Sequence, residues 1–527
     1  MRIVVASVHL EQGPDAVPLG AACIASSLKA AFPELALSLV ETFVADGAGP
    51  LAAKINAEYP QAIGFSLYTW NRYIILEAAK RIRTQNPSLF LFCGGPEATA
   101  LPEGLAVSEG GPFDAFVPGE GEAAVVELIG RRFAILSKQT PSDPEILPSP
   151  WLDGTLSVKG RNGVLWELAR GCPYSCAYCY ESKGNKRVRY FSEERLREEL
   201  QLFVREHVPY VFVLDPTFNS TAKRAMRILD MITAEIRRKA GPETHWHFEV
   251  RSELLTREQA RRFASLGASL QIGLQTADPK VSALIGRELN RGRFASRIGL
   301  LNEEGVVFGL DLIYGLPGDS LGGYRRSLDF ALALYPNSLD MFRLAILPGT
   351  VLYERAAEYG LMADGEAPYL VRSTPDFSAG DLDTAERLSE AADLFYNRGR
   401  AVAWFNQVLR PLRIKPSAFL EGFAENTKTA PIEEMQLAFL EERYRRAKKE
   451  ALFPAVRDLV RFHGAWGRAL AEGASTEINF TYHPDDVLGE GALDLETFAA
   501  RVLPRSVKAR VQPGKQGPEM ELGKGRL

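Results

Sequence analysis

The stretch that decides the fold is Arg170–Glu181, RGCPYSCAYCYE, which holds three of the five cysteines in the 527-residue chain. Cys172, Cys176 and Cys179 follow a C-x3-C-x2-C spacing and are called the cysteine triplet below. Thiolates hold iron–sulfur clusters, and a [4Fe–4S] cluster usually takes four of them. Because only three lie together here, one iron would keep an open position for a non-protein ligand, as catalytic metal sites do. The triplet therefore predicts a catalytic [4Fe–4S] cluster.

The main alternative for the triplet is a structural zinc site with a histidine as the fourth ligand. The first histidine downstream is His207, far from the triplet in sequence, so the iron–sulfur interpretation is favoured. Cys23 and Cys93 stand among apolar residues, and we expect both to be buried small side chains.

Strand and helix patterns alternate from Val164 onward, which indicates parallel β/α units. Ser192 is expected to cap the first helix after the triplet. Six such units predict an open relative of the (β/α)8 barrel, in which the chemistry sits on loops after the strands. The six strand candidates are VLWELA (164–169), YVFVLD (210–215), HWHFEV (245–250), SLQIGL (269–274), VVFGLDLIYG (306–315) and LDMFRLAI (339–346).

The triplet, its place after a first strand and the five following β/α units resemble the radical S-adenosylmethionine (SAM) superfamily. This resemblance implies that SAM chelates the open iron and is cleaved to a 5′-deoxyadenosyl radical. One departure is LDPTFN (214–219) after the second strand, where the family often has Gly-Gly-Glu. By strand position, the resemblance implies SAM contacts from Tyr178, Asp215, Thr217, Glu249, Arg251, Gly273 and Gln275.

Residues 1–136 also alternate strand and helix patterns and resemble the cobalamin-binding domain fused to many enzymes of this superfamily. The segments that carry this resemblance are PLGAACIASSLK (18–29), GFSLYTWN (64–71), CGGPEAT (93–99) and DAFVPGEGEAAVVEL (114–128). Glycines there would let the backbone approach a large ring. The resemblance implies cobalamin contacts from Ser66, Leu67, Tyr68, Thr69, Trp70, Asn71, Gly94, Gly95, Pro96, Glu97, Gly119, Glu120 and Gly121.

The chain departs from the best-known cobalamin domains at the histidine that ligates cobalt. Those domains carry Asp-x-His-x-x-Gly, whereas this chain has Ser7 in place of the aspartate and Gly13 one residue too far from His9. We therefore expect His9 to be a strand-end histidine, with the lower face of cobalt open or held by another residue.

The predicted organisation is α/β, with five parts. A Rossmann-like cobalamin-binding domain spans 1–136, a linker rich in Pro, Ser and Asp spans 137–160, and a partial (β/α)6 radical SAM barrel spans 161–370. A mainly helical C-terminal domain is expected over 371–510, with a disordered tail over 511–527.

Composition narrows the possible partners. A net charge of -4 provides no basic field for nucleic acid, and no apolar run is long enough to span a bilayer. The start of the chain lacks a secretory pattern, so a cytoplasmic location is expected. We expect a small-molecule or peptide substrate and an external reductant such as flavodoxin or ferredoxin.

The resemblance implies cobalamin-dependent methylation of an unactivated carbon, with a [4Fe–4S] cluster, SAM and cobalamin as cofactors. Cyclisation, rearrangement or oxidation with the same cofactors is an alternative that the sequence does not separate from methylation. A lesser alternative is a nucleic-acid- or peptide-binding protein whose iron–sulfur cluster is only structural.

Overall fold

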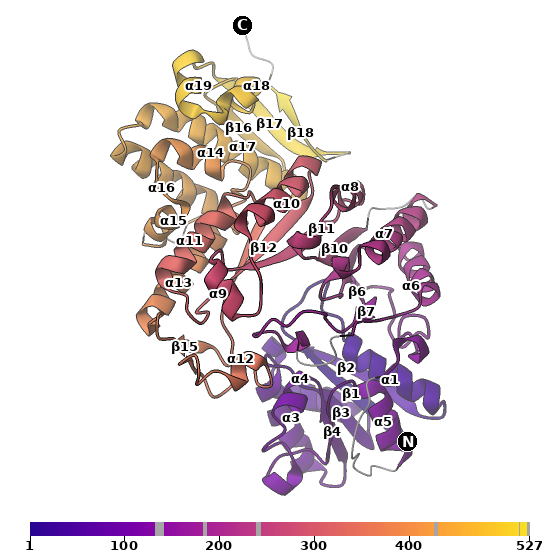
Figure 1. The fold of residues 1–527 in the computed structure, drawn as a ribbon. Helices are drawn as coiled ribbons and strands as arrows, with labels where there is room; N and C mark the ends of the chain where they lie inside the picture. Colours follow the sequence, from indigo (N-terminus) through magenta and orange to yellow (C-terminus); the bar gives the residue numbers. More distant parts are fainter. Residues whose placement is uncertain (132–141, 183–186, 239–243, 426–429, 516, 524–527) are drawn as a thin grey trace.

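The computed structural model describes residues 1–131, 142–182, 187–238, 244–425, 430–515 and 517–523. Figure 1 shows an N-terminal α/β domain at one end, a second parallel sheet with its helices in the middle, and a helical region with a small sheet at the other end. No helix among these residues is both long and apolar enough to cross a membrane.

The N-terminal domain is a five-stranded parallel sheet in the order β2-β1-β3-β4-β5. Separate apolar cores cover its two faces. The order reverses between β1 and β3, which is the type of position where ligands bind beyond the carboxyl ends of the strands. The strands are β1 Arg2–His9, β2 Ala36–Phe43, β3 Ala62–Ser66, β4 Phe90–Gly94 and β5 Ala115–Val117; the helices are α1 Leu19–Ala31, α2 Ala48–Ala57, α3 Arg72–Gln85, α4 Pro96–Ala100 and α5 Gly121–Gly130.

The middle region is a six-stranded parallel sheet in the order β13-β12-β11-β10-β9-β6, so the predicted partial barrel is confirmed. Each strand matches one of the six candidates. They are β6 Val164–Trp166, β9 Tyr210–Val213, β10 His245–Glu249, β11 Ser269–Gln275, β12 Val307–Tyr314 and β13 Ser338–Arg343. The helices are α6 Glu193–Arg205, α7 Ala222–Arg237, α8 Arg257–Ser265, α9 Pro279–Leu284, α10 Arg291–Glu304 and α11 Leu321–Leu332.

Local sequence explains both the helix starts and the faces of the strands. Ser192 caps α6 as predicted, because its hydroxyl accepts a hydrogen bond from the Arg195 backbone N–H. On β10, Trp246 and Phe248 are fully buried in the core, whereas Glu249 is exposed on the opposite, inner face. This alternation places the polar side chains of the strands on the inside of the curved sheet.

The C-terminal region is mainly helical, as predicted. Pro454 lies in the first turn of α17, where a missing N–H costs nothing. The elements after the barrel are α12 Val351–Glu354, β14 Met362–Ala363, β15 Val371–Ser373, α13 Ala379–Ala392, α14 Phe405–Leu409, α15 Pro416–Ala424, α16 Ile432–Arg446, α17 Phe453–Glu472, β16 Thr476–Phe480, α18 Pro484–Val487 and α19 Leu495–Arg501.

The expectation of a disordered tail over 511–527 is wrong for the described residues. β17 Val507–Gly514 pairs with β16 on one side and with β18 Gly517–Leu522 on the other, in a three-stranded antiparallel sheet. The polar, glycine-rich sequence reflects a hairpin with one solvated face, since Ala509 and Val511 are buried whereas Lys508 and Arg510 are exposed.

Candidate functional site

The cysteine triplet lies on a loop that other loops of the barrel hold in place. The Ala177 N–H donates to the Ile285 carbonyl (3.0 Å), and the Ala177 carbonyl accepts from the Leu352 N–H (2.8 Å). Gly286, with φ +73°, allows close contact, because a Cβ there would lie 2.5 Å from the Ser175 carbonyl oxygen. The thiols are therefore presented on a fixed backbone rather than on a free loop.

The donor set of the triplet, three thiols on one loop, fits a [4Fe–4S] cluster with one iron open to a non-protein ligand. Among the described residues, no three Cys, His, Asp or Glu side chains gather around one metal position. A structural zinc ion needs four ligands that converge on one point. In a cubane each thiolate binds a different iron, so three cysteines hold a cluster with one iron left open. Cys23 and Cys93 are buried in apolar surroundings, as predicted.

Two arginines that follow later strands support the triplet loop. The Arg251 guanidinium stacks on the Tyr174 ring, 3.7 Å from its centroid, and pairs with Glu253. Arg287 donates to the Tyr178 hydroxyl (3.2 Å) and to the Gly273 carbonyl (2.8 Å). Burial raises the pKa of Tyr178 to about 12, so this phenol stays protonated near neutral pH. The sequence contained no motif that indicated Arg287.

The residues predicted to contact SAM meet at one edge of the barrel, because β9, β10 and β11 are adjacent and parallel. Asn219, which sequence reasoning missed, joins two of these loops. Its side chain accepts from the Arg251 N–H and donates to the Arg251 carbonyl, both at 3.0 Å. The contacts of the predicted residues with SAM remain predictions.

Asp215 and Thr217, after β9, are engaged within the protein. Asp215 Oδ1 accepts from the Leu168 N–H at 3.1 Å, and the Thr217 hydroxyl donates to the Pro216 carbonyl at 2.7 Å. Burial raises the pKa of Asp215 to about 7. The Asp215 carboxyl therefore positions the strand that leads into the triplet.

Glu249 and Gln275 have more capacity to bind a ligand. The Glu249 side chain is exposed to solvent, but protein surrounds it on several sides. This partial burial, together with the nearby Asp311 and Glu181 carboxylates, raises the pKa of Glu249 to about 7. Both properties fit a side chain on a concave inner surface. Gln275, at φ +67°, places its amide against Gly273, and its buried Oε1 has no hydrogen-bond partner among the described residues. A buried acceptor of this kind is suited to a ligand hydroxyl or amine.

The loops predicted to contact cobalamin follow β3, β4 and β5, which are neighbours in the N-terminal sheet. Gly95, at φ +95°, packs against Leu67, where a Cβ would lie 2.6 Å from the carbonyl oxygen. Tyr68 and Trp70 stack with centroids 4.4 Å apart, and Trp70 is 44% exposed. This pair forms a flat, partly exposed surface at this edge of the sheet.

Several of the predicted cobalamin residues are engaged in structural contacts. Asn71 is buried and bonds to the backbone of Tyr68, Val8 and Ser66. Glu97 pairs with Arg72 at 3.1 Å and accepts from the Tyr369 hydroxyl at 2.8 Å.

The residues predicted for cobalamin on the loop after β5 are also engaged in contacts within the protein. Glu120 pairs with Arg189, and a Cβ on Gly121 would meet Ile24 of α1 at 2.6 Å. Gly119, at φ +71°, donates its N–H to the Thr99 hydroxyl. For Ser66, Thr69, Gly94 and Pro96, contact with cobalamin likewise remains a prediction.

His9 ends β1 and is paired with a carboxylate. Its Nε2 lies 3.2 Å from Glu41 Oε2, and Arg161 binds the other oxygen of Glu41 at 2.8 Å. This arrangement agrees with the expectation of a strand-end histidine.

Two family models match the chain. The B12 binding domain matches residues 2–129, and the radical SAM superfamily matches residues 166–331. The cobalamin-dependent radical SAM methyltransferase TokK of Streptomyces tokunonensis is 27% identical over 372 residues, covering 61% of this chain and 52% of TokK. The 2-(S-pantetheinyl)-carbapenam-3-carboxylate methyltransferase of Streptantibioticus cattleyicolor is 28% identical over 387 residues, covering 65% and 55% of the two chains. The chain thus spans about half the length of these curated relatives.

Solved structures show the same fold. TsrM from Kitasatospora setae, with cobalamin and a [4Fe–4S] cluster bound, superposes with a TM-score of 0.58 at 17% identity, over 85% of this chain and 99% of TsrM. OxsB, with aqua-cobalamin and SAM bound, gives a TM-score of 0.59 at 14% identity, over 94% of this chain and 83% of OxsB. The chain thus shares the fold of these proteins, and along its sequence a match to the B12 binding domain precedes a match to the radical SAM superfamily.

Proposed function

We propose that this protein is a cobalamin-dependent radical SAM enzyme that methylates an unactivated carbon. The observation that carries the proposal is the direct contact between the flanks of the triplet and the loops predicted for cobalamin. The Tyr180 hydroxyl, next to Cys179, donates to the Pro96 carbonyl at 3.3 Å. Arg170, two residues before Cys172, pairs with Glu122 at 2.6 Å, at the start of α5. These contacts support the proposal, because they join the triplet loop to the loops predicted for cobalamin.

Each part of the chain has a distinct role in this proposal. SAM bound at the iron–sulfur cluster supplies a 5′-deoxyadenosyl radical, and methylcobalamin supplies the methyl group. The triplet holds three irons, and Gln275 Oε1 offers an acceptor to SAM. Tyr68 and Trp70 form a flat surface for the corrin ring. Arg170, whose side chain is 13% exposed and bound to Glu122 and Glu167, fixes the domain interface.

The names of the relatives favour methylation over the other radical outcomes, since TokK and the carbapenam enzyme are both methyltransferases. We propose a small-molecule or peptide substrate, an external reductant such as flavodoxin or ferredoxin, and no role for nucleic acid. A reducing compartment such as the cytoplasm suits the five free thiols.

The test is anaerobic reconstitution of the full chain with iron, sulfide and cobalamin, followed by reductant and SAM labelled on its methyl group. We expect 5′-deoxyadenosine, S-adenosylhomocysteine and labelled methylcobalamin, and none of the 5′-deoxyadenosine with a Cys176→Ser variant. Formation of 5′-deoxyadenosine without S-adenosylhomocysteine or labelled cobalamin would exclude methylation and favour cyclisation, rearrangement or oxidation. Failure to cleave SAM at all would favour a structural cluster.

A further inference from the structure

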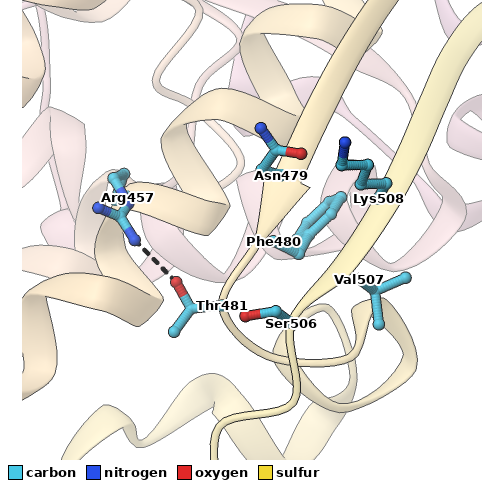
Figure 2. Close-up of a pocket in the computed structure, with 7 residues that line it drawn as sticks. All are labelled: Arg457, Asn479, Phe480, Thr481, Ser506, Val507 and Lys508. Atoms are coloured by element: carbon cyan, nitrogen blue, oxygen red, sulfur yellow. Dashed lines mark hydrogen bonds between the residues drawn. The ribbon is translucent and has the colours of Figure 1, made fainter. Parts of the chain in front are cut away.

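The C-terminal region holds a pocket of about 450 Å³ between the end of β16, the start of β17 and helix α17. Figure 2 shows the side chains around it, with Arg457 on one side and Lys508 on the other side of the Phe480 ring. The lining residues are Arg457, Asn479, Phe480, Thr481, Ser506, Val507 and Lys508. In Figure 1 this sheet lies at the opposite end of the molecule from the N-terminal domain, so the pocket is separate from the proposed active site.

Arg457 is fixed in the pocket but has hydrogen-bonding capacity left over. Its Nη2 donates to the Thr481 hydroxyl at 2.8 Å, as Figure 2 shows. Its Nε is buried and has no hydrogen-bond acceptor among the described residues. The described part of the chain also places no carboxylate within salt-bridge distance of this guanidinium. A buried donor on a charged group is costly to leave unpaired, so such a group indicates a missing acceptor.

The neighbouring Asp458 does not supply that acceptor. Its fully buried carboxylate accepts from the backbone N–H groups of Thr481 (2.7 Å) and Tyr482 (3.0 Å) and from the Thr481 hydroxyl (3.2 Å). Because the Thr481 hydroxyl donates its proton to Asp458, its oxygen is left to accept from Arg457. Asp458 thus orients Arg457 through Thr481 and remains committed to the loop.

Lys508 adds a second cation. It lies on the exposed face of β17 directly opposite the neutral Asn479, whereas Arg510 on the same face lies opposite Glu477. Among the described residues, Lys508 has no salt-bridge partner. Both charged residues that line the pocket are therefore cations, and the other polar groups are the hydroxyls of Ser506 and Thr481 and the Asn479 amide.

We propose that this pocket binds the oxyanion group, phosphate or carboxylate, of a small molecule. A guanidinium with free donors suits the paired oxygens of either group, and an ammonium adds a point charge. The hydroxyls and the amide supply neutral hydrogen bonds to the remaining oxygens. The inference is independent of the proposed methylation.

The test is a titration of the full chain with inorganic phosphate, and separately with acetate, at constant ionic strength kept with chloride. Binding is followed by the thermal unfolding midpoint and, for phosphate, by 31P NMR line broadening. We expect saturable binding of at least one of the two anions, and the anion that saturates at the lower concentration identifies the class. Lys508→Gln and Arg457→Gln should each weaken that binding by at least about tenfold, the loss expected for a charge-assisted hydrogen bond.

The matched control is Arg510→Gln, which removes one positive charge from the same strand outside the pocket lining. It should bind the anion as the wild type does. Lys508 is exposed, so its substitution keeps the test valid even if Arg457→Gln disturbs the Thr481 loop. The proposal is overturned if neither anion saturates, or if the Lys508→Gln variant and the control bind equally well.

Discussion

The clearest structural prediction concerns Glu97, which the sequence assigned to cobalamin and the structure places in a buried ion pair. The side chains of Arg72 and Glu97 are only 9% and 3% exposed, and the Tyr369 hydroxyl donates to the same carboxylate. Glu97→Ala would leave the Arg72 guanidinium buried without its counter-charge. Removing one partner of such a pair costs about 3–5 kcal/mol.

Tyr369→Phe provides a smaller perturbation of the same group. It removes a hydrogen bond to a charged acceptor, which costs about 1.5–3 kcal/mol. Because Glu97 and Tyr369 are partners, the double variant should lose less stability than the sum of the single variants. Tyr369 lies just before β15, so the pair of variants also tests the contact between this segment and the N-terminal domain.

Hydrogen exchange of the buried amides in β3 and β4 is the appropriate assay, because it reports the N-terminal domain separately in a multi-domain chain. At about 1.4 kcal/mol per tenfold change, Glu97→Ala should speed this exchange by roughly 10²–10⁴-fold. Glu77→Ala is the matched control, since Glu77 is exposed on α3 and, among the described residues, pairs only with Arg81; its effect should stay within about 0.5 kcal/mol. If the Glu97→Ala variant exchanges at the wild-type rate but binds cobalamin more weakly, Glu97 does not stabilise the domain and instead contacts the cofactor.

Three further predictions concern the barrel. The folded pKa of Asp215 is raised to about 7 from 3.8, so the native state holds a proton that the unfolded state releases; wild-type stability should therefore fall, relative to Asp215→Asn, as pH rises from about 4 to 7. Equal pH profiles in urea unfolding would contradict this. Asn219→Ala should free the Arg251 loop and weaken SAM binding about tenfold or more in equilibrium dialysis, as the loss of two buried hydrogen bonds implies. Alanine at any cysteine of the triplet should reduce the iron content of reconstituted protein, whereas Cys93→Ala should leave it intact; equal iron in both would exclude the triplet as the ligand set.

The fold of the barrel was predictable because each strand has a strong local signal. β9, β10 and β11 show period-2 alternation or β-branched and aromatic residues, and each is separated from the next by a helix. The triplet was predictable because its spacing is rare and its chemistry restrictive. The prediction of a disordered tail was wrong because β17 and β18 bury few apolar residues, and their stability depends on packing against β16 and α17.

The individual site contacts were less predictable, because a side chain that is suited to a cofactor is equally suited to a protein partner. Glu97, in α4, and Glu120, after β5, belong to the predicted cobalamin site, yet each forms an ion pair with an arginine distant in sequence. Asn219 and Arg287 have no motif around them, and their roles come only from the proximity of the β9, β10 and β11 loops. Long-range pairing of this kind is a property of the fold rather than of any local pattern.

The most direct test of the central claim, that the triplet holds a cluster with an open iron for SAM, is electron paramagnetic resonance. The reconstituted full chain is reduced anaerobically and its [4Fe–4S] signal is recorded before and after addition of SAM. We expect a reduced-cluster signal whose g-values change when SAM is added, and no such signal from a Cys176→Ser variant. A cluster signal that is identical with and without SAM would show that no iron of the cluster is open to SAM.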